Sequence, residues 1–442
     1  MNVGDGSPRP AVCVVGLGKI GLPLAVQIAG AGRRVAGADI NQAVVDLINA
    51  GTPPFPGEDE LDERLAAVVA GGMLQARTET SEAVSESDVV VVVVPLIIDD
   101  DHRSDFAALD AATEAVGRGL RPGTLVSYET TLPVGTTRTR FAPRLAELSG
   151  LIAGVDFFVC HSPERVSSGR VFADLRKYPK LVGGINAAST ASATKFYESI
   201  LGFDDRPDLD RGNGVWPLAS VEAAELTKLA ETTYRDINIA FANELAVHAD
   251  SRGIDIFEVI AAANSQPFSH IHQPGIAVGG HCIPVYPHLY LQGDPAARMP
   301  VASRQVNEAM PEYAVNRLAE AIGSLQDKVV VVLGLAYRGG VKESAFSGVF
   351  AVVAEIERHG ATALVHDPLY DDDEIAAFGF KPYVLGGDCD GVVVQADHAK
   401  YRGLTPDDFP GAGAVMDGRR VLDRSSFIGS PCRLLVIGGP ET

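Results

Sequence analysis

The sequence predicts an α/β fold with two Rossmann-like, doubly wound parallel-sheet domains joined by a helical middle domain that contains a long central helix. Three observations lead to this fold class. Short apolar runs alternate with helix-length segments through the first 200 residues, one uninterrupted helical stretch follows, and a second alternating set begins near residue 326. At 442 residues the chain also exceeds the roughly 250–300 residues at which a single core stops growing.

The first predicted domain covers residues 11–212 and follows a polar tail, residues 1–10, that we expect to be disordered. This tail lacks the apolar core of a signal peptide, and the apolar run at 89–94 is far too short to span a bilayer. We therefore expect a cytoplasmic protein with no membrane partner. The strands of the domain are predicted from apolar runs at Ala11–Val15, Arg34–Asp39, Asp88–Pro95, Thr124–Tyr128, Asp156–His161 and Leu181–Gly184.

The middle domain, residues 213–325, is predicted from one long helical segment between Ser220 and Gly253, with no proline or glycine inside it. At 1.5 Å per residue, this helix would be about 50 Å long. We interpret it as a domain connector or as the spine of a dimer. In the last domain, residues 326–442, strands are predicted at Lys328–Gly334, Ala361–His366, Gly391–Gln395, Ala414–Asp417 and Arg433–Ile437.

Charge and cysteine usage exclude some classes of protein. The formal net charge of −20 argues against a nucleic-acid partner, which would require a basic surface. The five cysteines are odd in number and unclustered, which is typical of a reducing compartment. We interpret Cys13, Cys160, Cys389 and Cys432, which lie mostly in apolar runs, as buried structural side chains.

A dinucleotide site is predicted where the first strand ends. Gly16, Gly18 and Gly21 fit the G-x-G-x-x-G spacing, which allows a tight turn, close approach of a pyrophosphate and close helix–strand packing. Asp39 ends the next strand about 20 residues later, where a carboxylate accepts from a ribose 2′-hydroxyl and repels a 2′-phosphate. This favours NAD over NADP. A glycine-rich turn without a cofactor is the alternative.

Cys282 is predicted to be a nucleophile because a glycine-rich loop that includes Gly275 and Gly279 leads directly to it. A thiol beside a redox cofactor can hold an aldehyde as a thiohemiacetal and lose a second hydride to form a thioester. His281 could activate the thiol, although adjacent side chains usually diverge. This combination of groups predicts a four-electron oxidation of an alcohol.

A zinc site is the main alternative at this loop, because His270, His272, His281 and Cys282 are close in sequence. Their spacing is not a standard pattern and lacks paired cysteines, so no metal is predicted. On the long helix, Lys228, Thr232 and Arg235 share one face. The lysine could stabilise an oxyanion, or these side chains could be solvated surface groups.

With these motifs, the chain resembles the nucleotide-sugar 6-dehydrogenases of the UDP-glucose/GDP-mannose dehydrogenase family from about Ala11 to Asp423. The motifs occur in family order: the glycine turn, Glu129–Thr137, Ser162–Val166, the Lys228 helix ending in Asn243–Glu244, and the cysteine loop. The resemblance implies NAD as cofactor, a UDP-sugar as substrate and a homodimer. It also implies that NAD binds the first domain and that the sugar nucleotide reaches the last one.

Residue roles follow from the same resemblance. The implied catalytic residues are Cys282 as nucleophile, Lys228 and Thr232 as hydrogen-bond donors, and Thr131 and Glu164, which would hold a water. Cofactor contacts are expected at Gly16, Gly18, Lys19, Ile20, Gly21, Asp39, Pro95, Thr131 and Lys342. Substrate contacts are expected at Glu164, Arg165, Val166, Lys228, Arg235, His272, Gly275, Gly279, Tyr337 and Arg338.

Three positions depart from the family pattern. Thr232 replaces an asparagine, Tyr286 replaces an aspartate, and Lys342 replaces an arginine. Threonine can still donate a hydrogen bond and lysine keeps the charge, but tyrosine cannot replace a carboxylate. The Ser162–Val166 motif and the Gly279–Pro284 loop resemble the branch that acts on UDP-N-acetylmannosamine or UDP-N-acetylglucosamine, with UDP-glucose as the alternative.

Two other functions stay open at this point. A two-electron hydroxyacid dehydrogenase would explain the glycine turn and the helical middle, but not the second sheet domain or the Cys282 loop. A non-catalytic protein that binds NAD or a UDP-sugar would explain why Tyr286 stands in place of a carboxylate.

Overall fold

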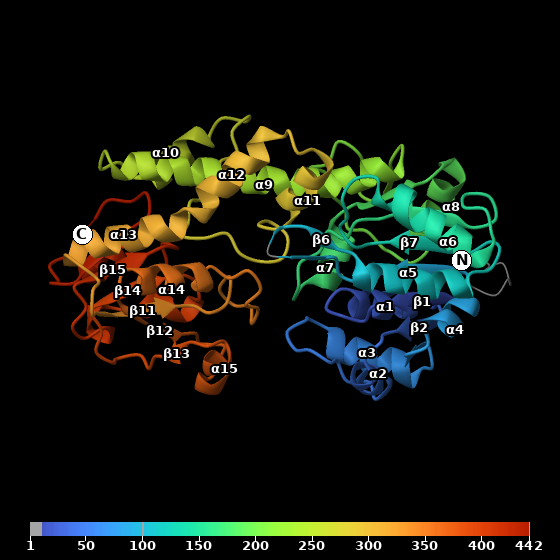
Figure 1. Cartoon of the computed structure of the whole chain (residues 1–442), viewed down its shortest axis with the longest axis horizontal. Coiled ribbons are helices and arrows are strands. Elements are labelled where there is room, and N and C mark those ends of the chain that lie inside the picture. The colour runs from blue at the N-terminus through green and yellow to red at the C-terminus, as the bar shows by residue number, and fades with distance from the viewer. Residues whose placement is uncertain (1–10, 100, 442) are drawn as a thin grey trace. The chain divides into compact units, whose positions relative to one another are not determined.

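The computed structural model describes residues 11–99 and 101–441, so the predicted tail lies outside the described residues. The chain divides between Ala230 and Glu231 into two compact units, and Figure 1 labels their helices and strands. The predicted α/β class is confirmed, since each unit contains a sheet with parallel strands and helices packed on it. No helix in the described part of the chain is long and apolar enough to cross a membrane.

Unit 1 is built on an eight-stranded sheet with the order β10-β9-β8-β7-β4-β1-β2-β3. Its strands are β1 (Val12–Val15), β2 (Val35–Ala38), β3 (Leu74–Arg77), β4 (Val89–Val92), β7 (Leu125–Tyr128), β8 (Phe158–His161), β9 (Lys180–Gly184) and β10 (Val215–Pro217). A separate small hairpin joins β5 (Ile97–Ile98) to β6 (Ser104–Asp105). The helices are α1 (Gly21–Gly30), α2 (Gln42–Asn49), α3 (Leu61–Ala70), α4 (Thr80–Ser85), α5 (Ala107–Gly119), the π-helix η1 (Thr137–Phe141), α6 (Ala142–Ser149), α7 (Val171–Lys177) and α8 (Ala187–Glu198).

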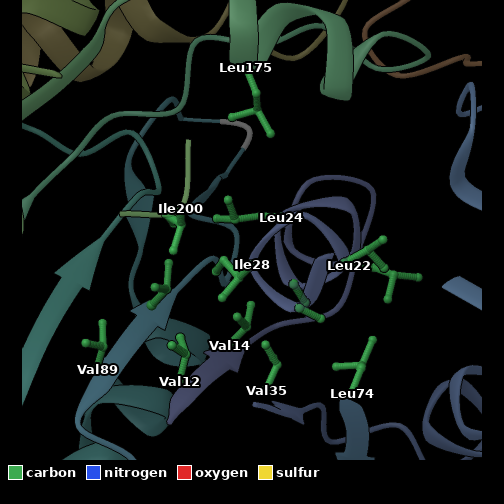
Figure 2. Close-up of a cluster of buried hydrophobic side chains, with 14 of the residues drawn as sticks. Val12, Val14, Leu22, Leu24, Ile28, Val35, Leu74, Val89, Leu175 and Ile200 are labelled. Carbon is green, nitrogen blue, oxygen red and sulfur yellow. The ribbon is translucent and has the colours of Figure 1, made fainter. Parts of the chain in front are cut away.

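Apolar residues cover both faces of this sheet. Successive β1 side chains point to opposite faces, so Val12 and Val14 belong to one buried cluster while Cys13 and Val15 belong to another. Figure 2 shows the first cluster, in which Leu22, Leu24 and Ile28 of α1 pack with the strand valines. Burial on both faces explains why the strands are continuous apolar runs.

The sheet of unit 1 differs from the prediction in three details. β10 was not predicted, and it lies within residues 213–325, which were expected to form the helical middle domain. β3 was not predicted, because Leu74–Arg77 contains only two apolar residues and lies at the edge of the sheet. β9 runs antiparallel to β8, with Cys160 opposite Gly184, and β10 runs parallel to β9. The two outer strands therefore run against the six parallel strands that carry the glycine turn.

Helix α9 (Val221–Asp250) continues from unit 1 into unit 2 and corresponds to the predicted long helix. It is 30 residues long, or about 45 Å at 1.5 Å per residue. Four shorter helices follow it: α10 (Ile256–Ala263), α11 (Tyr286–Gly293), α12 (Arg298–Glu308) and α13 (Met310–Ile322).

The sheet of unit 2 is parallel throughout and has the order β13-β12-β11-β14-β15-β16. Its strands are β11 (Val329–Leu333), β12 (Thr362–His366), β13 (Lys381–Pro382), β14 (Gly391–Val394), β15 (Ala414–Asp417) and β16 (Arg433–Val436). The connections contain α14 (Val349–Arg358), α15 (Asp372–Ala377) and the 3-10 turns η2 (Ala399–Gly403), η3 (Pro406–Asp408) and η4 (Arg424–Phe427). The strands expected in this domain are thus all present.

A buried polar network joins α9 to α12 within unit 2. The Asp236 carboxylate accepts hydrogen bonds from Arg304 Nε at 3.0 Å, Ser303 Oγ at 2.7 Å and Asn307 Nδ2 at 2.8 Å. Asn243, two turns further along α9, donates to Asn307 Oδ1 at 2.9 Å. The Asp236 carboxylate and the Arg304 guanidinium are both buried, so each needs the opposite charge of the other to offset its loss of hydration.

Replacing Arg304 by alanine should lower the free energy of unfolding by about 3–5 kcal/mol, because it leaves the Asp236 carboxylate buried without its cation. Arg358→Ala is the matched control: it removes an ion pair between the exposed Arg358 and the partly buried Glu355, and it should cost less than about 1 kcal/mol. Urea denaturation followed by circular dichroism measures both values. Equal costs for the two variants would contradict this role of the Asp236 network.

Candidate active site

The glycine turn between β1 and α1 has the geometry of a dinucleotide cradle. Gly16 has φ of +89°, and a Cβ there would lie 3.0 Å from the Val93 carbonyl oxygen. A Cβ on Gly21 would lie 1.9 Å from the Gly16 carbonyl oxygen, so only glycine allows α1 to approach β1 this closely. A Cβ on Gly18 would meet no protein atom within 4 Å. The space beside Gly18 is therefore open for a ligand.

The start of α1 is free to receive a negative charge. Ile20 is its N-cap residue and makes no side-chain cap hydrogen bond, and the first turn of this helix has no acidic residue. Lys19 precedes Ile20 in the same turn. Backbone N–H groups at a helix start bind phosphate oxygens when no side chain satisfies them. These residues fit a dinucleotide pyrophosphate.

Asp39 is fixed beside the turn by backbone amides. Its carboxylate accepts from Leu17 N at 2.9 Å and from Asn41 N at 3.0 Å. Asp39 follows β2 directly, and β2 pairs in parallel with β1, so the carboxylate lies at the carboxyl end of the sheet next to the glycine turn. The remaining acceptor sites of this half-buried group can receive a ribose hydroxyl.

Pro95 and Thr131 lie on the other side of the glycine turn, after β4 and β7. β4 pairs with β1 on the side opposite β2, which makes the edge between β1 and β4 a topological switch point. Thr130 Oγ1 donates to the Val94 carbonyl at 2.6 Å and so joins the two loops. Thr131 itself is 5% exposed. The predicted cofactor residues that follow β1, β2, β4 and β7 thus lie at the carboxyl ends of these parallel strands.

Glu164 follows β8 and is placed by the neighbouring strand. Its backbone N–H donates to the Glu129 carbonyl at 3.1 Å, and its carboxylate accepts from Val166 N within the same loop. Glu164, Arg165 and Val166 line a small pocket together with Lys180. The pocket volume of about 20 Å³ is enough for one water molecule.

A buried network lies beneath this loop. The Glu129 carboxylate accepts from Lys180 Nζ and from Tyr197 Oη, both at 2.6 Å. Burial raises the pKa of Tyr197 well above its ordinary value, and the adjacent Glu129 charge adds to the effect. His161 is also fully buried; desolvation, and then the Lys180 charge, lower its pKa to about 3. His161 is therefore neutral at physiological pH.

Cys282 differs from the other cysteines in its exposure. Cys13, Cys160, Cys389 and Cys432 are buried, as predicted, whereas Cys282 is partly exposed. Burial raises the pKa of Cys13 and Cys160 to about 12 and that of Cys389 and Cys432 to about 11. These four thiols are therefore protonated at physiological pH and shielded from reactants. Only the Cys282 sulfur is accessible for nucleophilic chemistry.

The loop that carries Cys282 packs against the turn after β11. A Cβ on Gly279 would lie 2.8 Å from Tyr337 Cβ and 2.8 Å from the Phe346 carbonyl oxygen. Gly280 has φ of +87°, and a Cβ there would lie 3.0 Å from the Tyr337 ring. The Gly280 N–H donates to the Ala345 carbonyl at 3.2 Å. The glycines thus allow close contact between two loops, which fixes the backbone next to Cys282.

Amide side chains of α9 hold the start of the same loop. Asn243 Oδ1 accepts from Gly275 N at 2.9 Å, and Asn238 Oδ1 accepts from His272 N at 2.9 Å. Asn238 also donates to the His270 carbonyl at 2.7 Å. The pKa of His272 is lowered by desolvation and by the Arg235 charge. His272 and Gly275, both predicted to contact substrate, are thus positioned by the long helix.

Arg419 completes this arrangement and was not predicted. Its Nη2 donates to the Ala277 carbonyl at 3.0 Å and its Nε donates to the Gln395 carbonyl at 2.7 Å, so it ties the cysteine loop to the carboxyl edge of the second sheet. Burial lowers its pKa, while Asp397 and Asp417 oppose this shift. Arg419 and Ala277 are 142 residues apart, so no local sequence pattern connects them. The one signal in the sequence was that Arg419 closely follows a predicted strand, β15.

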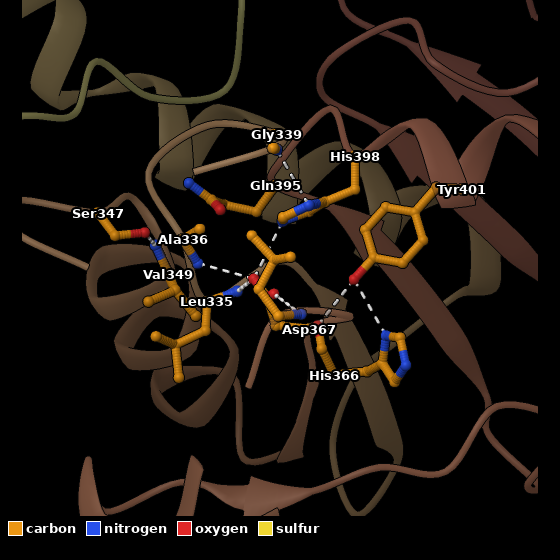
Figure 3. A network of polar contacts seen from close by, with 12 residues as sticks. Leu335, Ala336, Gly339, Ser347, Val349, His366, Asp367, Gln395, His398 and Tyr401 are labelled. Atoms are coloured by element: carbon orange, nitrogen blue, oxygen red, sulfur yellow. Dashed lines mark hydrogen bonds and ion pairs between the residues drawn. The ribbon is translucent and has the colours of Figure 1, made fainter. Parts of the chain in front are cut away.

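The turn after β11 is built around the buried carboxylate of Asp367. Asp367 Oδ2 accepts from the backbone amides of Leu335 at 2.8 Å and Ala336 at 2.9 Å, and lies 3.1 Å from His398 Nε2 (Figure 3). Asp367 is 2% exposed. Its acceptor sites are used within the protein, so this turn cannot bind a ribose hydroxyl as Asp39 can.

The side chains after this turn face different partners. Arg338 is exposed and donates to Tyr337 Oη at 3.0 Å. Lys342, predicted to contact the cofactor, forms an ion pair with Glu374 and lies 5.0 Å from the centre of the Tyr370 ring. Lys342 is thus paired within unit 2, and its predicted contact with the cofactor stays a prediction.

Within α9, Lys228 and Thr232 are buried, whereas Arg235 is exposed. One turn before Lys228, the Glu225 carboxylate accepts from Gly135 N and from Thr137 N, which ties the helix to the Glu129–Thr137 segment. Burial of Lys228 favours a specific role over solvated surface charge.

The predicted residues divide between the units. Unit 1 contains Gly16, Gly18, Lys19, Ile20, Gly21, Asp39, Pro95, Thr131, Glu164, Arg165, Val166 and Lys228, and unit 2 contains Thr232, Arg235, His272, Gly275, Gly279, Cys282, Tyr337, Arg338 and Lys342. Among the residues described, no three His, Cys, Asp or Glu side chains are grouped so as to hold a metal ion.

Gly18→Ala should weaken NAD binding at least about tenfold without changing the melting temperature. The added methyl group would meet no protein atom within 4 Å but would occupy the open space beside the turn. Gly30→Ala, at the other end of α1 and equally free of neighbours, is the control and should bind NAD normally. Isothermal titration with NAD compares them. Equal affinities would contradict the assignment of the cradle.

Comparison with known proteins gives matches along most of the chain. Three models of the UDP-glucose/GDP-mannose dehydrogenase family match: the NAD binding domain at residues 10–201, the central domain at 222–309 and the UDP binding domain at 331–424. A UDP-N-acetyl-D-mannosamine dehydrogenase of Pyrococcus horikoshii is 34% identical over 95% of this chain and 96% of its own.

Two further relatives carry other names. An NDP-N-acetyl-D-galactosaminuronic acid dehydrogenase of Ralstonia nicotianae is 33% identical over 90% of this chain and 92% of its own. The solved structure of a UDP-glucose dehydrogenase from Pyrobaculum islandicum has a TM-score of 0.83 and 30% identity, and covers 95% of this chain and 96% of that chain. The predicted family and the predicted use of NAD are confirmed. The chain belongs to the UDP-glucose/GDP-mannose dehydrogenase family and is an NAD-dependent nucleotide-sugar dehydrogenase, an oxidoreductase.

Proposed function

We propose that this enzyme oxidises the 6-hydroxymethyl group of a UDP-N-acetylhexosamine to the carboxylate in two successive two-electron steps, with Cys282 as nucleophile. The observation that carries this proposal is the contrast between Cys282 and the other cysteines: four thiols are buried, whereas Cys282 is partly exposed on a glycine loop. A partly exposed thiol on a well-fixed loop can reach a sugar carbon.

The proposed reaction follows from the chemistry of sulfur. After the alcohol has been oxidised to an aldehyde, the Cys282 sulfur adds to the carbonyl carbon and forms a thiohemiacetal. A second oxidation converts this adduct into a thioester, and water then releases the uronate and restores the thiol. Gly16, Gly18 and Gly21 would hold NAD at the start of α1, where the cofactor would supply the hydride acceptor for each oxidation. The product is two hydrides poorer than the substrate, so two NAD are reduced per sugar.

The remaining roles are assigned to groups whose surroundings support them. Lys228 is buried and is a donor, so we assign it to the oxygen at the reacting carbon, with Thr232 one turn further along the helix. Glu164 lines a pocket with room for one water, and we assign it to hold the water that hydrolyses the thioester. Thr131 does not line this pocket, and its role at the same water rests on the family resemblance alone. The other cofactor and substrate contacts keep the roles that were expected from the sequence.

Tyr286 does not take over the missing carboxylate. Its backbone N–H donates to the Cys282 carbonyl at 3.0 Å at the start of α11, so the residue helps to shape the loop. A phenol does not act as a carboxylate base at neutral pH. We therefore assign the base function to Glu164 instead of to the residue four positions after the cysteine.

The substrate is proposed to be UDP-N-acetylmannosamine or UDP-N-acetylglucosamine. The names of the Pyrococcus horikoshii and Ralstonia nicotianae relatives, both for N-acetylated sugars, support this class. UDP-glucose is the alternative, because the Pyrobaculum islandicum structure is nearly as similar to this chain. The match to a UDP binding domain at residues 331–424 supports a UDP-sugar in either case.

We also propose three domains, residues 11–212, 213–325 and 326–442, and a homodimer formed through the helical middle. The three matched ranges, 10–201, 222–309 and 331–424, support this division.

The dimer proposal is supported by large apolar side chains that are exposed on the middle helices and their connections, among them Tyr234, Phe241, Phe268 and Met299. Exposed apolar groups of this kind typify subunit interfaces. Light scattering should give the mass of two chains; the mass of one chain at micromolar concentration would contradict the dimer.

Wild-type enzyme should form two NADH per UDP-sugar oxidised, and Cys282→Ser should form at most one, because serine cannot complete the thioester stage. The measurement is nicotinamide absorbance with product mass, against UDP-N-acetylmannosamine, UDP-N-acetylglucosamine, UDP-glucose and GDP-mannose. Cys389→Ser, at a buried thiol, is the control and should keep the wild-type ratio. A wild-type ratio of one, or UDP-sugar binding with no NADH formed, would contradict the proposal.

A further inference from the structure

The loop that carries Glu164 and Arg165 is held by a carboxylate from a distant part of unit 1. Glu58 lies between α2 and α3, and its Oε2 accepts from Gly169 N and its Oε1 from Val171 N, both at 2.6 Å. Gly169 has φ of +87°, and a Cβ there would lie 3.2 Å from the Gly57 carbonyl oxygen. The Gly57–Glu58 segment therefore lies directly against the end of the loop.

Burying the Glu58 carboxylate costs free energy, because the charged form loses its hydration. We infer from this cost that Glu58 does more than fill space between the helices. Glu58 is 7% exposed, and burial raises the pKa of its carboxyl. The Gly169 and Val171 amides lower the pKa, whereas the nearby Asp59 and Asp174 charges raise it further. The two amide hydrogen bonds thus compensate a carboxylate that has two negative neighbours. Charge-assisted bonds of this kind are stronger and more directional than bonds between neutral groups.

The rest of the loop is fixed at several points, so a constraint at Glu58 extends to Glu164. Asp174 Oδ2 accepts from Ser167 N at 3.0 Å, and Arg165 donates to the Pro179 carbonyl at 3.2 Å. The Glu164 N–H donates to the Glu129 carbonyl. Between Ser162 and Val171 the loop is thus bonded at its start, middle and end, and Glu58 supplies two of the bonds at its end.

We propose that Glu58 is a positioning residue for nucleotide-sugar oxidation, which holds the 162–171 loop so that Glu164 and Arg165 are in place before the UDP-sugar arrives. This inference rests on the proposed function, because it takes those two residues as substrate contacts. Glu58 acts through the loop and does not itself touch the sugar. It also links the segment after α2, on the Asp39 side of the sheet, to the loop expected to bind the sugar.

Glu58→Gln is the test variant, because it keeps the shape of the side chain while replacing one acceptor oxygen by a donor that faces a backbone N–H. Its KM for the UDP-sugar should rise at least about tenfold, from loss of one charge-assisted hydrogen bond. Its KM for NAD should stay within about twofold of wild type. Glu60→Gln, two residues away at an exposed pair with Arg64, is the control and should change neither value.

Hydrogen exchange of the ligand-free protein provides a readout that does not depend on the reaction. In Glu58→Gln the amides of Gly169 and Val171 should exchange at least about tenfold faster than in Glu60→Gln, while core strands exchange at the wild-type rate. Unchanged exchange would overturn the inference. Faster exchange with an unchanged KM, or a rise of both KM values with a lower melting temperature, would also overturn it. Absence of UDP-sugar oxidation by the wild type would instead refute the proposed function.

Discussion

In each unit, an aspartate carboxylate accepts hydrogen bonds from the turn that follows the first strand of the sheet, and this constraint fixes the backbone of the turn. In unit 1, Asp39 accepts from the Leu17 amide, and in unit 2, Asp367 accepts from the Leu335 amide. Each aspartate directly follows the neighbouring parallel strand. The bond fixes the turn over the carboxyl edge of the sheet, which is where ligands bind in folds of this type.

The two units use this constraint differently. Asp39 is half-buried next to an open glycine turn, whereas Asp367 is enclosed with His398 and further backbone amides. The turn of unit 2 is therefore a rigid support, and the Gly279–Gly280 segment before Cys282 packs directly on its Tyr337. One unit thus offers a dinucleotide site, and the other presents a thiol on a firmly held loop. The glycine fingerprint is therefore expected only in unit 1, where the turn binds the dinucleotide. The corresponding turn of unit 2 instead supports the cysteine loop.

Much of this could be predicted from the sequence, because the determinants are local. The glycine turn and Asp39 form a fingerprint with fixed spacing, and buried parallel strands are continuous apolar runs. The cysteine loop stands out through its glycines. Features that depend on long-range contacts were missed or incompletely predicted: the antiparallel direction of β9, the edge strand β3, and the ties made by Arg419 and Glu58. Arg419 and Glu58 bond to backbone groups more than one hundred residues away, and no local pattern encodes such a partner.

The proposed reaction requires that the Cys282 sulfur hold the carbonyl intermediate as a covalent adduct. Rapid-quench peptide mass spectrometry of the enzyme, mixed with NAD and the UDP-sugar that it oxidises, would detect this adduct. We expect a transient sugar adduct on the peptide that contains Cys282 and none on the four buried cysteines. Complete oxidation to the uronate with no adduct on Cys282 at any time would contradict it.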